Sequence, residues 1–510
     1  MSAVPISEYR LLMDRERQII LLESAKSILH WDMETKMPPR GITLRSLQLA
    51  QMAQTIHQMS TSPELGRLLK TILNSPGYDS MDSVQKRNVY LVKRRYDEAT
   101  ALPEELVAET ARQEAVATDV WKKAKAARDF SIFRPELDRL IELKRRAAEL
   151  LRDVKQVPTP YDALIDLYEP GVTSAVISKL FEDLQSGLTE LLRRYVPVCQ
   201  QVDTSPLHRR VPVEVQKIIS NRLVEFLGYD VNSKSAGGRI DETEHPFTSG
   251  YYDDVRITTH YYEDNFSSSI FSTLHEAGHA MYDQGLNPEW VFQPVGSPCS
   301  LGIHESQSRF VENIVGRSLE FWSYFLPKLK ELTGATFQDL DVKGFTRLVN
   351  IVRPSKIRIE ADEVTYSLHV IIRFELEKEI VAGNISTSEL PDVWNQKYKD
   401  YLDVTIEHDS EGVMQDTHWA SGLIGYFPTY ALGNIYSGQI LAEMEKSLPE
   451  WRTQVSQGDF SHVKRWMTEN VYRYGNLYDP VELVRKITEQ DVTVKPFIDY
   501  LKRKYREIYP

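Results

Sequence analysis

Residues 267–283 read SSSIFSTLHEAGHAMYD, and the interpretation of the whole sequence starts from this stretch. Its apolar residues recur at the three- and four-residue spacing of an α-helix, and they are Ile270, Phe271, Leu274, Ala280 and Met281. Because His275 and His279 are four residues apart, their imidazoles project from one face of that helix and can reach one metal ion. Glu276 lies beside this pair, where it can act on a water molecule rather than bind the metal. The stretch therefore predicts a helix that carries a catalytic HExxH site, with zinc as the expected metal.

A catalytic zinc needs a third protein ligand and an open position for water. Glu305 is the candidate, because it lies at the start of the next strong helical pattern, from which a packed helix could present its carboxylate. Gly278 would let another chain segment approach the first helix closely. The metzincin pattern HExxHxxGxxH is absent, since Tyr282 and Gly285 stand where its glycine and third histidine would be. Two alternatives stay open at this point. The histidines could be a hydrogen-bonded pair in a core, and Glu305 could be a first-turn glutamate favoured by the helix dipole.

Helical periodicity dominates the rest of the chain. It is found at 8–29, 42–58, 83–99, 104–126, 135–154, 174–196, 213–227, 303–326, 345–351, 361–381, much of the region after Leu390, and 481–508. Residues 228–243 are rich in Gly, Ser and Asp, so we expect a loop there, which is the clearest seam in the chain. Residues 255–262 are the best strand candidate, and they could form an edge strand that pairs with an extended substrate backbone. We therefore expect a mostly α fold with a small β-sheet beside the zinc helix.

The bulk composition limits the class of protein. The 510 residues are 42% hydrophobic and 26% charged, as in ordinary soluble proteins. A net charge of -12 has the wrong sign for binding phosphates, so nucleic acid is not an expected partner. The only cysteines, Cys199 and Cys299, are too few for a disulfide framework, and a reducing, cytoplasmic setting is expected. The sequence has neither a signal-peptide pattern at its start nor a run of about 18 apolar residues, so no membrane is expected.

Short motifs along the chain carry a resemblance to a known family. In order they are HPF (245–247), DVRIT (254–258), HEAGH (275–279), HESQ (304–307), IRIEAD (357–362) and GVMQDTHW (412–419). Together with HWD (30–32) and PYDAL (160–164), they resemble the carboxypeptidase Taq family of metallocarboxypeptidases. The resemblance implies a single, almost wholly helical body with a deep groove, a homodimer, zinc or cobalt at the site, and removal of one residue at a time from peptide C-termini.

By motif position, the resemblance implies the same three metal ligands and the same general base that the spacing predicts. It further implies that Arg358, Arg256 and His418 lie at the substrate end of the groove. Tyr430 would face the carbonyl oxygen of the substrate. From the residues alone, Arg358 could instead form a structural ion pair with nearby acids such as Glu360, and His418 could fill a core. The resemblance favours Arg358 most as the anchor for the substrate carboxylate, and the planar fork of an arginine can hold both carboxylate oxygens, which a lysine cannot do.

The expected function is hydrolysis of the C-terminal peptide bond, with Glu276 as general base and with Tyr430 and His418 donating hydrogen bonds to the developing oxyanion. Another zinc peptidase, an endopeptidase or aminopeptidase, is the first alternative, although an aminopeptidase would need acids to hold the substrate ammonium. The second alternative is a non-catalytic helical peptide-binding protein, in which a structural metal would need a fourth ligand. We expect residues 1–510 to form one domain, with a helical part at about 1–227 and a catalytic part at about 240–510.

Overall fold

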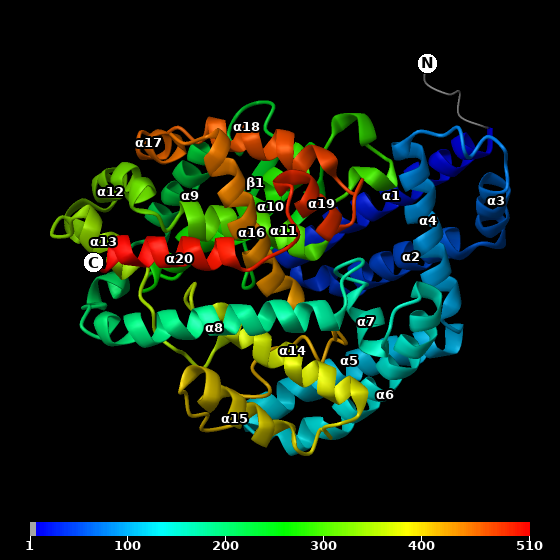
Figure 1. The fold of residues 1–510 in the computed structure, drawn as a ribbon, viewed down its shortest axis with the longest axis horizontal. Helices are drawn as coiled ribbons and strands as arrows, with labels where there is room; N and C mark the ends of the chain where they lie inside the picture. Colours follow the sequence, from blue (N-terminus) through cyan, green and yellow to red (C-terminus); the bar gives the residue numbers. More distant parts are fainter. Residues whose placement is uncertain (1–6) are drawn as a thin grey trace.

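The structure is a computed structural model, and it describes residues 7–510. Its helices are α1 (Ser7–Thr35), α2 (Ile42–Thr61), α3 (Pro63–Leu73), α4 (Ser83–Ala101), α5 (Glu104–Ala127), α6 (Phe130–Lys155), α7 (Pro160–Ile165), α8 (Ser174–Cys199), α9 (Val213–Leu227), α10 (Phe266–Gly285), α11 (Leu301–Arg309), α12 (Leu319–Thr333), α13 (Val342–Leu348), α14 (Tyr366–Ala382), α15 (Leu390–Leu402), α16 (Pro428–Ser447), α17 (Trp451–Ser456), α18 (Ser461–Asn470), α19 (Pro480–Thr488) and α20 (Lys495–Ile508). The strands are β1 (Gly238–Glu242), β2 (Thr248–Tyr251) and β3 (Asp254–Thr259). The predicted mostly α fold is confirmed (Figure 1).

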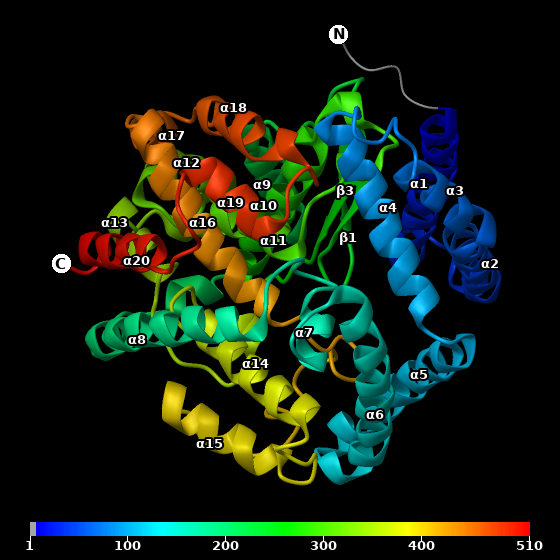
Figure 2. The ribbon, with the colours of Figure 1, turned by 45° about the vertical axis from the view of Figure 1, so that its right-hand side comes forward.

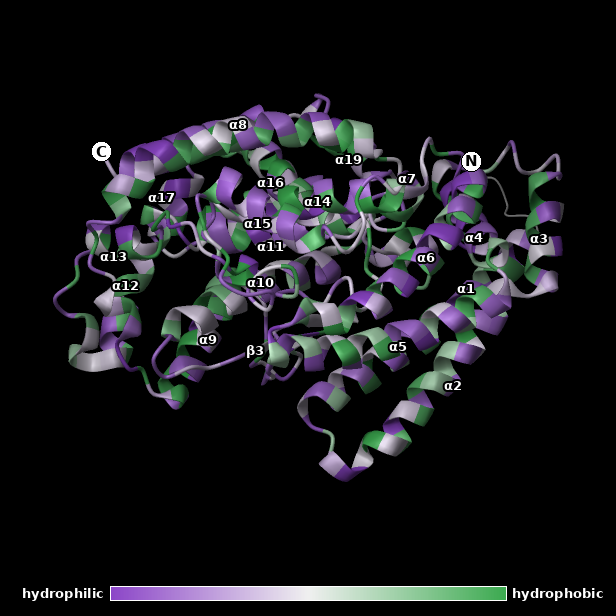
Figure 3. Cartoon of the chain, turned by 90° about the horizontal axis from the view of Figure 1, so that it is seen from below, coloured by the Kyte–Doolittle hydropathy of each residue, from purple (hydrophilic) through white to green (hydrophobic). Residues whose placement is uncertain are grey.

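The helices pack around a large hydrophobic core, and α16 runs through its interior with residues on all sides buried (Figure 1). The helix α11 packs against α16, and α10 packs in turn against α11. The N-terminal helices α1, α3 and α4 have a smaller hydrophobic cluster of their own, which includes Tyr9, Leu12, Leu65 and Val92. Figure 2 shows these helices on one side of the molecule, beyond the sheet. Figure 3 shows α2 extending outward from the body below α1, with hydrophobic and hydrophilic residues interspersed along it.

The sheet has the strand order β1-β3-β2, with β1 parallel and β2 antiparallel to the central strand β3. It packs against α10, as predicted for a small sheet beside the zinc helix. Two sequence predictions were wrong here. The expected loop at 228–243 contains β1, whose five residues include a single apolar side chain, Ile240, and so show no strand pattern. The strand predicted at 255–262 ends at Thr259 and is the central strand, so it cannot be the edge that binds a substrate backbone.

Several predicted helices differ from the observed ones. The single helix expected at 303–326 is divided into α11, a π-helix at Phe310–Val315, and α12, because the Ser318 side chain accepts from the Phe321 N–H and starts a new helix. The stretch 481–508 forms two helices, because Glu489 ends α19 with a positive φ of 57° and Pro496 lies in the first turn of α20. The helix α3 was not predicted. Within residues 7–510, no helix combines the length and apolar character that crossing a bilayer requires.

Candidate metal centre and active site

Three side chains converge between α10 and α11. His275 and His279 lie one turn apart on α10, and Glu305 comes from α11. The Oε2 atom of Glu305 is 3.6 Å from Nε2 of His275 and 3.4 Å from Nε2 of His279. The donor atoms of all three residues lie within 4.8 Å of one another. In a tetrahedral zinc site with bonds of about 2.0 to 2.1 Å, ligand atoms are about 3.3 Å apart. Two imidazoles and one carboxylate at this spacing therefore fit a catalytic zinc ion.

Glycines bring these helices close enough for the three side chains to meet. A Cβ atom on Gly278 of α10 would lie 2.7 Å from the carbonyl oxygen of Gln307 and 2.7 Å from Cα of Ser308 on α11. On α16, a Cβ atom at Gly433 would lie 2.9 Å from Cγ of Glu305. Backbone contact at these two positions sets the distance between the histidines and the carboxylate. The predicted close approach at Gly278 is thus confirmed.

A second set of charged groups holds the candidate ligands in place. The Oε2 atom of Glu312 is 2.9 Å from Nδ1 of His275, which leaves Nε2 of that ring directed at Glu305. Arg309 donates from Nε to Oε1 of Glu305 at 2.6 Å, and from Nη1 to Glu312 at 3.2 Å. Burial raises the pKa of Glu312, but Arg309 and His275 outweigh it and lower that pKa to about 2. Burial likewise raises the pKa of Glu305, which Arg309 and His275 nevertheless hold well below its ordinary value. Both carboxylates are therefore ionised at neutral pH.

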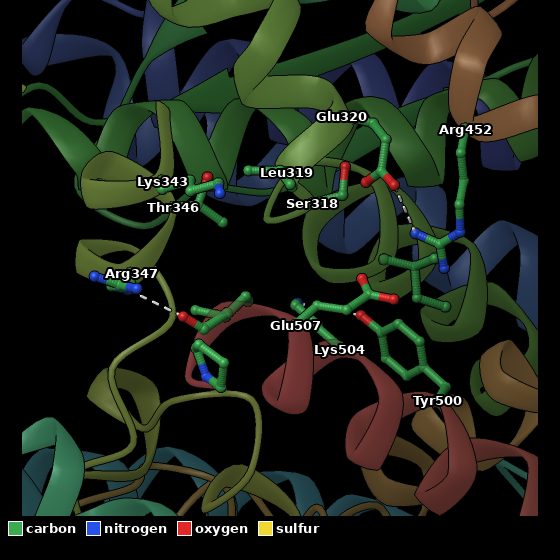
Figure 4. Close-up of a pocket in the computed structure, with 13 residues that line it drawn as sticks. Ser318, Leu319, Glu320, Lys343, Thr346, Arg347, Arg452, Tyr500, Lys504 and Glu507 are labelled. Carbon is green, nitrogen blue, oxygen red and sulfur yellow. Dashed lines mark hydrogen bonds and ion pairs between the residues drawn. The ribbon is translucent and has the colours of Figure 1, made fainter. Parts of the chain in front are cut away.

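Glu312 belongs to the π-helix, a feature that often marks a functional site. On the far side of this π-helix, Tyr500 and Lys504 of α20 donate to the carbonyl oxygen of Asn313 at 3.2 and 3.0 Å. Both also bond the carboxylate of Glu363, at 2.9 and 2.6 Å. Figure 4 shows Tyr500 and Lys504 in the wall of a pocket between α12, α13 and α20. The buried pair thus supports the π-helix through the carbonyl group of the residue next to Glu312.

Glu276 projects from α10 beside the histidines and is buried. Its Oε2 atom accepts a hydrogen bond of 2.6 Å from Oγ1 of Thr248 on β2. This hydrogen bond holds the carboxylate in one position through Oε2, and Oε1 takes no part in it. Thr248 gave no signal in the sequence, because its role depends on the sheet packing against α10.

The predicted substrate-binding arginine, Arg358, is buried in an ion-pair cluster. Its Nε and Nη2 atoms donate to Oδ1 of Asp416 at 3.1 and 2.9 Å, and Nη1 donates to the Tyr366 hydroxyl at 3.0 Å. Arg373 donates to the other oxygen of Asp416 at 2.7 Å. Two guanidinium groups thus share one carboxylate, so the cluster keeps a net positive charge. The ring of Tyr366 also lies 4.1 Å from the guanidinium of Arg309, which connects this cluster to Glu305.

His418 and Tyr430 lie against the same cluster. Nε2 of His418 is 3.2 Å from the Tyr430 hydroxyl, and the ring of Tyr430 is 5.0 Å from the Arg358 guanidinium. Burial lowers the pKa of His418 to about 4, with Arg358 and Arg373 adding to the shift and Asp416 opposing it. The imidazole is therefore neutral at pH 7. The structure brings Arg358, His418 and Tyr430 together beside the candidate ligands.

Arg256 lies elsewhere. It pairs through two hydrogen bonds with Asp254 at 2.7 and 2.8 Å, and its guanidinium is 4.3 Å from the ring of Trp31 on α1. In the register of the sheet it stands opposite Ser249, whose hydroxyl contacts Ser27 of α1. Successive side chains of a strand face opposite sides, so Ser249 and Arg256 lie on the face away from Thr248 and α10. The structure does not bring Arg256 to the candidate metal centre.

A cleft of about 690 Å³ borders the site. One wall comes from α1 and α4, and the other from residues 167–170, 293–301 and His304. The ring of His304 stacks on that of His279 at 4.4 Å, so His304 lies between the cleft and the candidate ligands. Gly250 and Tyr251 of β2 also line it. The cleft is therefore bounded by both the N-terminal helices and the catalytic part.

Comparison with known proteins gives the family. The model of the carboxypeptidase Taq (M32) metallopeptidases matches residues 11–505. The chain belongs to this family. Thermostable carboxypeptidase 1 of Thermus thermophilus is 40% identical over 99% of both chains, and carboxypeptidase 1 of Bacillus subtilis is 38% identical over 97% of both. The crystal structure of an M32 carboxypeptidase from Deinococcus radiodurans R1 superposes with a TM-score of 0.94 at 33% identity, covering 99% of each chain. This member of the family is therefore a metallocarboxypeptidase that acts on peptides.

Proposed function

We propose that this metallocarboxypeptidase uses zinc, held by His275, His279 and Glu305, to hydrolyse the last peptide bond of its substrates. The observation that carries the proposal is the convergence of two imidazole nitrogens and one ionised carboxylate at zinc spacing. When bound, zinc supplies a Lewis acid that polarises the scissile carbonyl and lowers the pKa of water. Among residues 7–510, this group contains three protein ligands and no fourth, which favours a catalytic over a structural metal.

Glu276 is the proposed general base. Its carboxylate takes a proton from the attacking water and passes it to the nitrogen of the departing amine. The hydrogen bond from Thr248 fixes the rotamer of Glu276 beside His275. A base held in this way needs no rearrangement before it acts.

Arg358 is the proposed anchor for the free carboxylate of the substrate. The cluster of Arg358, Asp416 and Arg373 keeps a net positive charge in a buried setting, where charge is most effective. Tyr430 is placed to donate its hydroxyl proton to the substrate carbonyl oxygen, with neutral His418 at 3.2 Å as its partner. These roles explain why the enzyme cleaves the peptide bond before a C-terminal residue rather than an internal bond.

The free edge of β2 is the proposed binding edge for the substrate backbone. In an antiparallel pair, residues alternate between hydrogen-bonded and non-bonded positions. Thr258 N donates to Phe247 O, so the next bonded pair is Ser249 with Arg256. The backbone groups of Thr248 and Gly250 therefore point away from β3, and Gly250 lines the cleft. An extended peptide could add to this edge as a further strand.

We propose the metal, the oligomeric state, the domain organisation and the cellular setting on the same basis. The metal is zinc, with cobalt as an alternative, and the protein acts as a homodimer, as the family resemblance implies. Residues 1–510 form one domain with a helical part at about 1–227 and a catalytic part at about 240–510. A cytoplasmic setting agrees with Cys199 and Cys299, which are both buried and free.

The decisive experiment follows the products of a mixed peptide by mass spectrometry, with the zinc-loaded parent and Glu276→Gln side by side. We expect a ladder that shortens from the C-terminus with the parent and almost none with the variant. Internal fragments or N-terminal ladders would support the endopeptidase or aminopeptidase alternatives. Absence of cleavage with added zinc or cobalt would instead support a peptide-binding protein.

A further inference from the structure

Glu169 is a buried carboxylate outside the groups discussed so far. It lies in the connection between α7 and α8 and is 0% exposed. Its Oε1 atom accepts from the Tyr436 hydroxyl at 2.9 Å and from the Ser300 hydroxyl at 3.1 Å, and Oε2 accepts from the Gly302 N–H at 2.9 Å. In residues 7–510, no lysine, arginine or histidine forms an ion pair with it. A buried charge without a cation is costly, so its retention calls for an explanation.

Two of the three donors belong to the start of α11, the helix that carries Glu305. Ser300 is the N-cap of α11, since its Oγ accepts from the Ile303 N–H at 3.0 Å. The same hydroxyl donates its hydrogen to Glu169, so the cap is itself held by this carboxylate. A Cβ atom on Gly302 would lie 2.5 Å from Oε2 of Glu169, so glycine is needed for the carboxylate to reach the backbone. The positive end of the helix dipole adds to the attraction.

The third donor connects Glu169 to α16. Tyr436 follows Gly433 by three residues, so the two lie on the same side of α16. Gly433 is the position at which α16 packs against Cβ and Cγ of Glu305, whereas Tyr436 donates to Glu169. Glu169 therefore bonds both of the helices between which the Glu305 side chain is packed. In addition, the backbone N–H of Leu301 donates to Tyr168 O at 3.1 Å, beside Glu169 in sequence.

We propose that Glu169 is a positioning residue that fixes the first turn of α11 against α16 and thereby sets the position of Glu305. This inference rests on the proposed role of Glu305 as a metal ligand. Burial raises the pKa of Glu169 to about 7, although the hydrogen bonds from Tyr436, Gly302 and Ser300 oppose that shift. The carboxylate form suits the position, because the Gly302 N–H can only donate and the Ser300 oxygen already accepts from Ile303. An amide at position 169 could not accept from all three donors, so one of them would lose its partner. The residue touches no substrate and acts only through α11.

Glu377 provides a matched comparison. It is also a fully buried glutamate with three donors, namely Tyr161 Oη at 2.8 Å, Trp419 Nε1 at 2.8 Å and Gly425 N at 2.9 Å. These groups lie in α7 and in the segment after His418, and none is in α11 or α16. Replacing either glutamate by glutamine disturbs a buried carboxylate with three hydrogen bonds. Only the Glu169 variant disturbs the helix that presents Glu305.

The test measures zinc affinity by competition with a chromogenic chelator, together with thermal unfolding of the metal-free proteins. We expect Glu169→Gln to bind zinc about 10-fold to 100-fold more weakly than the parent, the usual range when a group supporting a ligand is lost. Tyr436→Phe removes one donor and leaves the charge, so it should weaken zinc binding by a smaller factor and serves if Glu169→Gln folds poorly. Glu377→Gln should bind zinc within about twofold of the parent. Excess zinc should restore most of kcat in Glu169→Gln, which it would not do for general damage to the fold.

Two results would overturn the inference. The first is that Glu169→Gln and Tyr436→Phe both bind zinc as tightly as the parent, while Glu305→Ala has lost the metal. The second is an equal loss of zinc affinity in Glu377→Gln and Glu169→Gln, which would make the effect one of general stability. If Glu305→Ala binds zinc like the parent, the ligand set of the proposed function fails, and this inference fails with it.

Discussion

The Nδ1 atom of His275 lies 2.9 Å from Oε2 of Glu312, and the acid comes from a π-helix that packs between α10 and α20. Because Glu312 is ionised, Nδ1 of His275 donates its hydrogen to that carboxylate, and Nε2 faces Glu305. An acid in this position orients the ring and raises its basicity as a ligand. No sequence motif marks Glu312 as this acid.

Glu312→Gln should weaken zinc binding by about 10-fold to 100-fold, because the amide cannot stabilise the His275 tautomer as a carboxylate does. Chelator competition measures the affinity. Glu320→Gln is the matched control, since Glu320 pairs with Arg452 on the other side of the π-helix and should leave zinc binding unchanged. Equal affinities in the parent and Glu312→Gln would show that the contact does not support the ligand.

Replacing the candidate ligands should remove the metal itself. His275→Ala, His279→Ala and Glu305→Ala each leave two protein ligands, too few for stable zinc binding. Metal content after dialysis, measured by elemental analysis, gives the stoichiometry. If Glu305→Ala retains one zinc per chain with unchanged affinity, the third ligand lies elsewhere.

Glu276→Gln should separate binding from chemistry. We expect it to keep zinc but to lose about 100-fold to 10,000-fold in kcat, because the amide cannot take a proton. Zinc stoichiometry and steady-state kinetics on one peptide measure both effects. Activity within about tenfold of the parent would remove Glu276 from its role as general base.

Arg358→Ala should abolish the preference for a free C-terminal carboxylate. With the parent, amidation of the substrate should lower kcat/KM by about 10-fold to 100-fold, the value of a charge-assisted bond of about 1.5 to 3 kcal/mol. In Arg358→Ala, acid and amide should be cleaved at similar rates, so mutation and amidation are non-additive. Arg256→Ala is the control, because Arg256 packs on Trp31 at the other face of the sheet and should retain the preference. Retention of the full preference in Arg358→Ala would place the anchor elsewhere.

The Asp416 cluster should make the fold sensitive to acid. Burial raises the pKa of Asp416, but Arg373 and Arg358 outweigh it and hold the pKa well below its ordinary value of 3.8. On acidification the unfolded chain therefore takes up this proton first, so the stabilisation is complete above about pH 3.8 and is lost as the pH falls further. At pH 7, Asp416→Asn should lower the free energy of unfolding by about 3 to 5 kcal/mol, because two buried guanidinium groups lose their partner. Denaturant unfolding from pH 7 to 3 should show this difference narrowing only below pH 4; a constant difference would argue against the linkage.

The sequence predicted the parts of the site that depend on local spacing. The position of His275 relative to His279 follows from helix geometry alone, and Glu305 could be chosen because it begins the next helix. Glu312 could not be identified, because a π-helix changes which side chains share a face and leaves no clear sequence pattern. The role of Thr248 and the remote position of Arg256 depend on the register of the sheet. The sequence predicted a loop where β1 lies, at residues 238–242. The sheet could therefore not be assembled from the sequence, and the face to which each side chain of β3 points could not be derived.

Arg358 forms the ion pair that the sequence left open as an alternative, and its role as substrate anchor stays a prediction. Arg358 does pair with an acid, but the partner is Asp416 in a distant motif rather than the neighbouring Glu360. Sequence proximity is a poor guide here, because a 3-10 turn at Arg358–Glu360 directs the guanidinium inward, whereas Ile359 beside it is 75% exposed. Only the folded chain shows that Arg373 competes for the same carboxylate.

The candidate metal ligands and Glu312 come from a short stretch, 275–312, whereas Arg358, His418 and Tyr430 come from 358–430. Each stretch contains ion pairs of its own, and Tyr366, which contacts Arg309 and Arg358, links the two. In the proposed function, hydrolytic chemistry and the choice of substrate end thus depend on two separate stretches of the chain. Substitutions in the second stretch could therefore change which peptide terminus such an enzyme binds, while the first stretch stays unchanged.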